Sequence, residues 1–161
     1  MTIDYNDYNF FQASQFAVTI DKQRFASLQY YAQRLIHPGI AVSGAQVPVS
    51  RLTTISIPGD TLNFDELQMD ILLDEEWKSY SEFNSWLQSL TQERSDYTAN
   101  TFIESDITVV AFNSHNNKSK TIKYINCVPT SVGAITFDAT VGDTEVITFP
   151  VTFKIDFFEI T

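Results

Sequence analysis

Few side chains in this sequence could support metal binding or nucleophilic catalysis. His37 and His115 are its two histidines, and neither has a second ligand at a spacing typical of a zinc site. His37 precedes a Pro-Gly pair and His115 lies in a polar segment, so we interpret both as solvated loop residues. The single Cys127 cannot form an internal disulfide. Its place beside Val128 and Pro129 favours a buried apolar role over a nucleophilic one.

Acidic residues gather in two places. The run at 74–76 could form paired carboxylates for acid–base catalysis, but it directly precedes a helical pattern. A carboxylate there can cap free backbone N–H groups and interact with the positive end of the helix, which we favour. Asp60, Asp65 and Glu66 lack the alternating spacing of a calcium loop. Since no phosphate-binding loop or nucleophile elbow occurs, the sequence predicts a non-enzyme without cofactor or metal.

The composition indicates a globular chain with an acidic surface. Its 161 residues include 43% hydrophobic residues, and 20 acidic against 10 basic residues give a formal net charge of −10. This balance disfavours a groove that grips phosphates, which needs clustered Lys and Arg. No apolar run approaches the ~20 residues that span a bilayer, and the start does not resemble a signal peptide. We expect a single domain over 1–161.

The stretch 57–91 contains the clearest local signals. Residues 58–60 (Pro-Gly-Asp) predict a turn, and residues 64–73 alternate between apolar and polar types as a half-buried strand does. From about 75 to 91 apolar residues recur at helical spacing. They form a broad aromatic face that we expect to pack in the core, made of Trp77, Tyr80, Phe83, Trp86, Leu87 and Leu90.

The remaining segments are mostly β-rich. Residues 25–36 fit a helix as well as a strand, and we favour a strand. Residues 1–14 predict an extended N-terminal arm, and 40–57 a long protruding hairpin, because prolines favour an edge over a central strand. Other predicted strands are 15–21, 103–112, 120–128, 134–139 and 146–160, with a polar hairpin tip at 113–119 and a turn at 129–133. The sequence therefore predicts a mainly β fold: a β-sandwich or half-barrel of about seven or eight antiparallel strands with one flanking helix.

Several of these segments together resemble the tail tube proteins of contractile-tailed bacteriophages. They are the run 47–60, the strand and helix start at 64–77, the Pro-Thr-Ser-Val-Gly turn and strand at 128–138, and the closing strand at 147–159. Each motif is short and degenerate, and the resemblance depends on their order and spacing from about Phe16 onward.

The resemblance implies a β-barrel-like subunit that forms hexameric rings, stacked into a tube inside a contractile sheath. Its partners would be copies of itself, the sheath, the baseplate hub and the tail terminator, with DNA passing through the lumen and no membrane contact. The location would be the virion tail, assembled in the host cytoplasm. The family places the 40–57 hairpin and the arm between rings, so the candidate inter-subunit residues are Tyr5, Tyr8, Phe10, Phe11, Val42, Val47, Val49 and Arg51.

Polar residues that share one strand face are candidates for the wall of the lumen. They are Ser50, Thr54, Ser56, Glu66, Gln68, Asp70, Thr152, Lys154 and Asp156. Our hypothesis is that an acidic, hydroxyl-rich wall lets DNA slide because it offers no cation to the phosphates.

Three other functions remain open from the sequence. Within the same superfamily, the chain could form a baseplate-proximal tube initiator ring or a type VI-like secretion tube. A monomeric β-sandwich binding module is the third alternative, with its ligand site on the N-terminal arm or at the 113–119 tip.

Overall fold

The computed structural model describes residues 15–20, 32–50, 53–91, 104–138, 140 and 146–161. The predicted N-terminal arm, with its candidates Tyr5, Tyr8, Phe10 and Phe11, lies outside the described residues, and so does Arg51.

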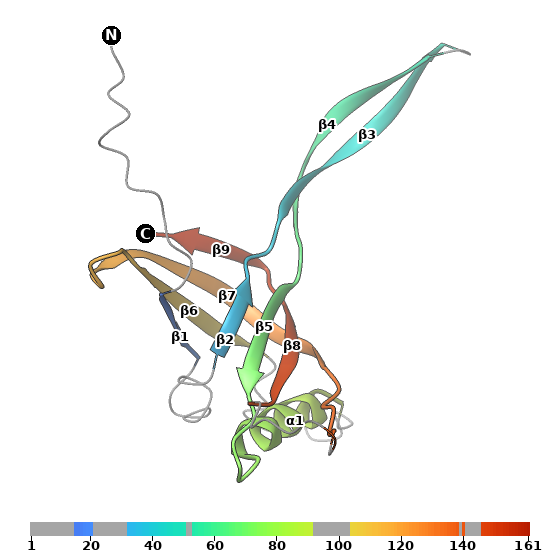
Figure 1. The fold of residues 1–161 in the computed structure, drawn as a ribbon. Helices are drawn as coiled ribbons and strands as arrows, with labels where there is room; N and C mark the ends of the chain where they lie inside the picture. The colour runs from blue at the N-terminus through green and yellow to red at the C-terminus, as the bar shows by residue number, and fades with distance from the viewer. Residues whose placement is uncertain (1–14, 21–31, 51–52, 92–103, 139, 141–145) are drawn as a thin grey trace, which may run out of the picture.

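The described residues form nine strands and one helix (Figure 1). Their order is β1 (Phe16–Thr19), β2 (Ala32–Ile36), β3 (Ile40–Ser50), β4 (Thr53–Phe64), β5 (Leu67–Leu72), α1 (Lys78–Thr91), β6 (Ser105–Phe112), β7 (Lys118–Val132), β8 (Thr148–Lys154) and β9 (Phe157–Ile160).

Seven strands form one antiparallel sheet, and β3 and β4 form a separate two-stranded ribbon that projects from it (Figure 1). The order in the sheet is β1-β6-β7-β8-β5-β2, and β9 pairs with β7 outside this path. The helix α1 lies at the end of the curved sheet opposite the ribbon. The predicted mainly β half-barrel with one flanking helix is confirmed, and β2 resolves the ambiguity of 25–36 in favour of a strand where the structure describes it.

Strand β7 belongs to both halves of the sheet. Its first part pairs with β6 and β9, and its last part pairs with β8. Between these parts, the pairing of β7 with β6 shifts register, because β7 has one more residue than β6 over this stretch. Asn126 has a φ of 55° there, which Asn tolerates better than most residues. Such a bulge bends a strand, and it lets both Tyr124 and Cys127 point into the core.

The core lies between the two halves of the sheet, with α1 closing one end. The alternation predicted from the sequence is confirmed in β5 and β8, whose inward residues are buried and pair across the strands: Leu67 with Phe153, Met69 with Val151, and Ile71 with Phe149. From α1, Phe83 and Trp86 pack on the ring of Phe153 with centroids 5.8 Å away in each case. Burial of such aromatic side chains dominates the stability of a domain this size.

The predicted capping role of Asp74 is confirmed, but the helix begins later than predicted. The Asp74 carboxylate accepts hydrogen bonds from the backbone N–H groups of Lys78 and Ser79, both at 3.0 Å. A turn that contains Glu75 and Glu76 separates Asp74 from the helix. The first turn of the helix therefore contains no acidic residue.

The predicted turn at Pro58-Gly59-Asp60 is wrong, because these residues lie within β4. No glycine among the described residues has a positive φ. Each strand of a two-stranded ribbon forms backbone hydrogen bonds with a partner strand on one side only. Pro58, which has no N–H group, can therefore lie in the ribbon without leaving the carbonyl of a neighbouring strand unpaired. The register with β3 shifts between Val42 and Gly44, where β4 carries the extra residues. The ribbon therefore extends to Phe64, beyond the predicted end at Ile57.

Three other boundaries differ from the predictions. The expected turn at 129–133 lies largely within β7, and Pro129 is fully buried. Residues 134–138 form no strand. The predicted closing strand 146–160 breaks at Ile155 and Asp156, where the Asp156 N–H donates to the carbonyl of Ile125 (3.3 Å). Phe157 is consequently 41% exposed instead of facing the core. The predicted hairpin between β6 and β7 is confirmed, since Asn113 closes the tip by accepting from the N–H groups of His115 and Asn117.

Candidate assembly surfaces

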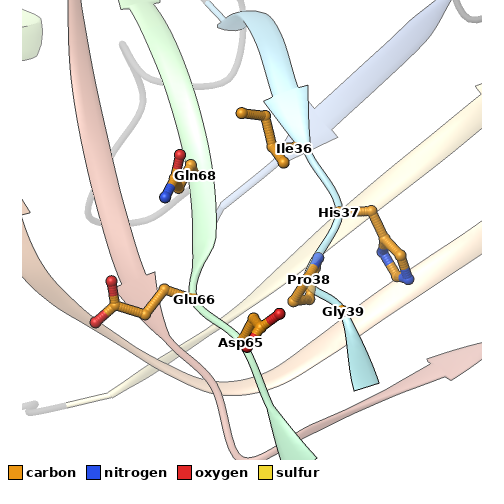
Figure 2. Close-up of a pocket in the computed structure, with 7 residues that line it drawn as sticks. All are labelled: Ile36, His37, Pro38, Gly39, Asp65, Glu66 and Gln68. Carbon is orange, nitrogen blue, oxygen red and sulfur yellow. The ribbon is translucent and has the colours of Figure 1, made fainter. Parts of the chain in front are cut away.

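The ribbon joins the sheet at a narrow junction that contains an open pocket of 380 Å³ (Figure 2). The two connecting segments are 37–39, before β3, and 65–66, after β4. The pocket is lined by Ile36, His37, Pro38, Gly39, Asp65, Glu66 and Gln68. In Figure 2 the His37 ring points away from Glu66 and Gln68, toward the opposite side of the junction.

An aromatic cluster holds both legs of the ribbon at this junction. The ring of Phe158, from β9, contacts His37 with centroids 4.5 Å apart and Phe64 with centroids 5.6 Å apart, both edge-on. His37 Nδ1 lies 2.8 Å from the hydroxyl of the fully buried Tyr124. Burial raises the pKa of Tyr124 and lowers that of His37. Both groups are therefore neutral near pH 7 while they share this hydrogen bond.

Asp65 and Gly39 tie the two connecting segments together. The Asp65 N–H donates to the Gly39 carbonyl at 3.0 Å. A Cβ atom at position 39 would lie 2.6 Å from Asp65 Oδ2, so a larger residue there would require the exposed Asp65 side chain to move. The junction is a built feature that sets the direction in which the ribbon leaves the sheet.

The distal half of the ribbon has one apolar and one polar face. Val47 pairs with Ile55 across the strands, and Ile57 lies two residues further on the same face. These three residues, the ribbon apolar stripe, are 42%, 52% and 47% exposed, respectively. Gln46 and Ser56 pair on the opposite face. Contiguous exposed apolar side chains of this kind mark an interaction surface.

The predicted inter-subunit residues of β3 lie on this ribbon. Val47 belongs to the apolar stripe, and Val42 is 54% exposed opposite Leu62 nearer the base. The backbone of Val49 lies in β3, but its side chain is outside the description.

The predicted lumen residues do not all lie on one surface. Gln68 of β5 and Thr152 of β8 are directly paired on the outward face of the sheet. Asp70 lies on the same face, half-buried, with its carboxylate 3.7 Å from the guanidinium of Arg34. Exposed Lys154 continues this face along β8.

Glu66 and Gln68 both line the pocket at the ribbon junction, whereas Ser56 lies on the ribbon. Asp156 accepts a hydrogen bond from the Asn126 side chain at the break between β8 and β9. The side chains of Ser50 and Thr54 are outside the description, although their backbones lie in the ribbon. With Arg34 and Lys154, the face is mixed in charge rather than uniformly acidic.

Three strands of the sheet have a single partner within the described residues. β1 pairs with β6, β2 pairs with β5, and β9 pairs with β7. Each has one row of backbone groups that no described strand pairs with, and such a row can be extended by another chain.

Cys127 and His115 are two of the side chains that the sequence offered for catalysis or metal binding. Cys127 is fully buried, and burial raises the pKa of its thiol to about 12. His115 is exposed at the hairpin tip. Within the described part of the chain, no group of three His, Cys, Asp or Glu side chains is placed to hold a metal ion. No helix of that part is long and apolar enough to cross a bilayer.

A family model described as phage tail tube protein matches residues 11–161. The chain belongs to the phage tail tube protein family. No curated protein matches the sequence. The role that follows from the family is a structural one, in the tube of a phage tail.

Solved structures share the fold at low sequence identity. The sheath–tube complex of an extracellular contractile injection system, PVC, contains a chain with a TM-score of 0.68 and 16% identity, covering 97% of this chain and 93% of that one. The tube-terminating cap of the anti-feeding prophage gives 0.67 and 15%, covering 99% and 95%. An Hcp protein gives 0.52 and 10%, covering 91% and 98%. The predicted tail-tube-like fold is therefore confirmed.

Sequence reasoning missed two features of these surfaces. It assigned Trp77 to the core, whereas Trp77 is 40% exposed and stacks on Phe137, which is 67% exposed. It also missed the role of Phe158 at the ribbon junction. The Asp-Phe-Phe-Glu end of the chain contained a signal, because adjacent aromatics cannot both face one side of a strand.

Proposed function

We propose that copies of this chain form hexameric rings that stack into the tube of a contractile tail. The family match over 11–161 carries this proposal. The exposed ribbon and the strands with one partner support it, because a free subunit leaves apolar side chains and backbone hydrogen-bonding groups uncovered. In this proposal the whole chain acts as a single tail-tube domain, without catalytic activity, in the virion tail.

The surfaces suggest how each contact is made. Neighbours in a ring would extend the sheet through its open edges, which leaves no strand edge exposed around a closed ring. The ribbon, and the arm at 1–14, would contact the adjacent ring. The sheath, the baseplate and the terminator are proposed as further partners, since similar folds occur in a sheath–tube complex, a sheath/tube terminator and a baseplate.

We propose that the outward face of β5 and β8 lines the lumen through which DNA passes. Asp70 is paired with Arg34, so this wall presents little uncompensated charge near it. At a screening length of ~10 Å, such a wall interacts with passing phosphates only near contact. This modifies the sequence-based hypothesis: the wall resists DNA adhesion through the Asp70–Arg34 pair and neutral side chains, with Lys154 as an exposed cation along the face.

Electron microscopy of the purified protein tests the assembly. Rings with six-fold symmetry, or tubes built from them, are expected at high protein concentration. A monodisperse monomer over the same range, also in the presence of sheath protein, would overturn the proposal and favour the binding-module alternative.

The lumen assignment is tested in assembled tails. We expect Gln68→Lys combined with Asp70→Lys to slow DNA ejection, because both changes add cations to the paired face. Lys118→Glu, at the start of β7 beside the hairpin tip, is a control at a distant exposed position. Unchanged ejection from intact tails that carry the double variant would reject the lumen assignment.

A tube that injects cargo other than DNA is the second candidate. The fold similarity to an extracellular contractile injection system and to Hcp favours it. Purified native particles distinguish the two candidates: DNA-filled capsids on the tails support the phage function, and capsid-free sheathed tubes support the injection function.

A further inference from the structure

Trp77 has an unusual backbone conformation for a large aromatic residue. Its φ is 58°, in the left-handed region where bulky residues are genuine outliers. A residue in that region costs on the order of 1–3 kcal/mol and persists only where the surroundings enforce it. Here the Trp77 N–H donates to the Asp74 carbonyl (3.0 Å) and its carbonyl accepts from Ser81 (2.9 Å). The turn before α1 therefore holds this side chain at the surface despite the backbone cost.

The Trp77 ring forms part of a supported surface. It stacks on Phe137 with centroids 5.8 Å apart and an interplanar angle of 22°. Tyr80 contacts it edge-on from behind at 5.6 Å, and Tyr80 in turn contacts the buried Phe149 at 5.5 Å. We call Trp77 and Phe137 the aromatic platform. An unbroken series of ring contacts therefore connects the platform to the core.

The surroundings of the platform are acidic and apolar. Glu75, Glu76 and Asp138 are exposed and lie within two residues of the platform rings in the sequence, and Glu76 forms an ion pair with the exposed Lys78. Val146 is 70% exposed, next to Ile147, whose carbonyl accepts from the Leu73 N–H at the same end of the molecule. A partner for this surface needs apolar side chains and no negative charge.

The ribbon of the same protein has these properties, but it lies at the other end of the molecule. Figure 1 shows α1 at one end of the sheet and the ribbon projecting from the opposite end. The ribbon apolar stripe is exposed. Arg51 is the single charged residue in the sequence from 40 to 59, and the exposed Asp60 of β4 lies beyond Ile57, on the side of the stripe toward the sheet. The two surfaces are complementary, and their separation prevents contact within one copy. A head-to-tail contact between copies buries both and repeats without limit along an axis.

We propose that the aromatic platform of one copy is the docking site for the ribbon apolar stripe of a second copy. This inference rests on the proposed self-assembly, and it names the receiving surface and its chemistry. Trp77 is the anchor, because large aromatic residues that become fully desolvated carry most of the energy of an interface.

Cysteine cross-linking tests this contact directly, since the native Cys127 is buried. A variant with both Ile57→Cys and Phe137→Cys is expected to form a ladder of disulfide-linked species larger than dimers under oxidation. A mixture of the two single variants is expected to stop at linked dimers, because each copy then contributes one end. Val47→Cys with Phe137→Cys samples the neighbouring position on the stripe.

Loss of the ring tests the anchor. Trp77→Asn retains a residue that tolerates positive φ and removes the aromatic side chain. We expect it to raise the concentration needed for tube formation at least about tenfold, with thermal unfolding of the unassembled subunit little changed. His115→Asn, at the distant exposed tip, is expected to assemble as the native chain does.

The outcomes separate this inference from the proposed function. Tubes that form normally from Trp77→Asn, together with no ladder from either double-cysteine variant, would overturn the docking site and leave the tube function intact. Absence of rings and tubes from the native chain would overturn both.

Discussion

The hydroxyl of Tyr124 lies 2.8 Å from Nδ1 of His37, at the point where the ribbon leaves the sheet. A buried tyrosine on β7 is thereby connected to the residue that starts one leg of the ribbon. Phe158 contacts the rings of both residues and also Phe64 on the other leg. The direction of the most exposed element is thus set by side chains that are anchored in the core.

The burial of the His37 ring at this junction predicts a loss of stability in mild acid. The pKa of His37 is lowered from 6.5 by burial, so the unfolded chain binds the proton more readily. The contribution of neutral His37 to the free energy of unfolding is fully present above pH 6.5. It is lost as the pH falls through the lowered pKa of His37 in the folded state. His37→Gln should show a smaller fall in the free energy of unfolding between neutral and mildly acidic pH.

Chemical denaturation at a series of pH values measures this difference. His115→Gln serves as the matched control, because His115 is exposed at the hairpin tip. Identical pH profiles for His37→Gln and the native chain would contradict the assignment.

Removal of the Asp74 carboxylate should destabilise the start of α1. Burial alone would raise the pKa of Asp74, but hydrogen bonds from Ser79 and Lys78 outweigh it and lower the pKa below 3.8. Asp74→Ala should lower the free energy of unfolding at pH 7 by about 1 kcal/mol, up to about 2. The difference should shrink as the pH falls below 3.8 and through the lowered pKa, because the native carboxylate is then protonated. Glu75→Ala, which removes an exposed carboxylate, should change stability by less than about 0.5 kcal/mol.

Two glycines of the ribbon should respond differently to alanine. A Cβ at Gly59 would overlap the backbone carbonyl of Ser43 across the ribbon, so Gly59→Ala should force the strands apart and impair assembly. A Cβ at Gly44 would lie 3.3 Å from the Ser56 hydroxyl, which can move. Sedimentation of assembled material measures both variants, and equal assembly would show that the paired geometry of the ribbon is dispensable.

The bulge in β7 predicts an unusual order of stabilities at position 126. Both Asn126→Gly and Asn126→Ala remove the side-chain hydrogen bond to Asp156. Only alanine retains a Cβ at a φ of 55°, which disfavours it by roughly 1–2 kcal/mol. Asn126→Gly should therefore be the more stable of the two in thermal unfolding. The reverse order would mean that the bulge relaxes without cost.

Local patterns predicted much of this fold. Alternation located β5 and β8 and their inward faces, since one side of each is buried. Asp74 was correctly predicted to cap the helix. The failures occur where tertiary context overrides local chemistry. Pro58 and Gly59 resemble a turn in the sequence, but a two-stranded ribbon can contain them. The end of β7 near Pro129 likewise reads as a turn, yet pairing with β8 continues the strand.

The candidate surfaces were harder to predict than the fold. Alternation identified Gln68 and Thr152 as outward residues, and the structure pairs them directly. It could not assign Ser56 to a different surface, because that depends on the ribbon leaving the sheet. Trp77 fits helical periodicity, and only the turn that starts the helix late reveals that its ring is exposed. Such features depend on contacts between distant segments, which one sequence does not display.

The passage of β7 through both halves of the sheet has a mechanical consequence. A force that pulls the two halves of the subunit apart along this strand acts on covalent bonds, whereas elsewhere it acts on hydrogen bonds between strands. The wall of a subunit built this way resists shear as one elastic unit. In a tube, that stiffness would oppose buckling of the wall under an axial load.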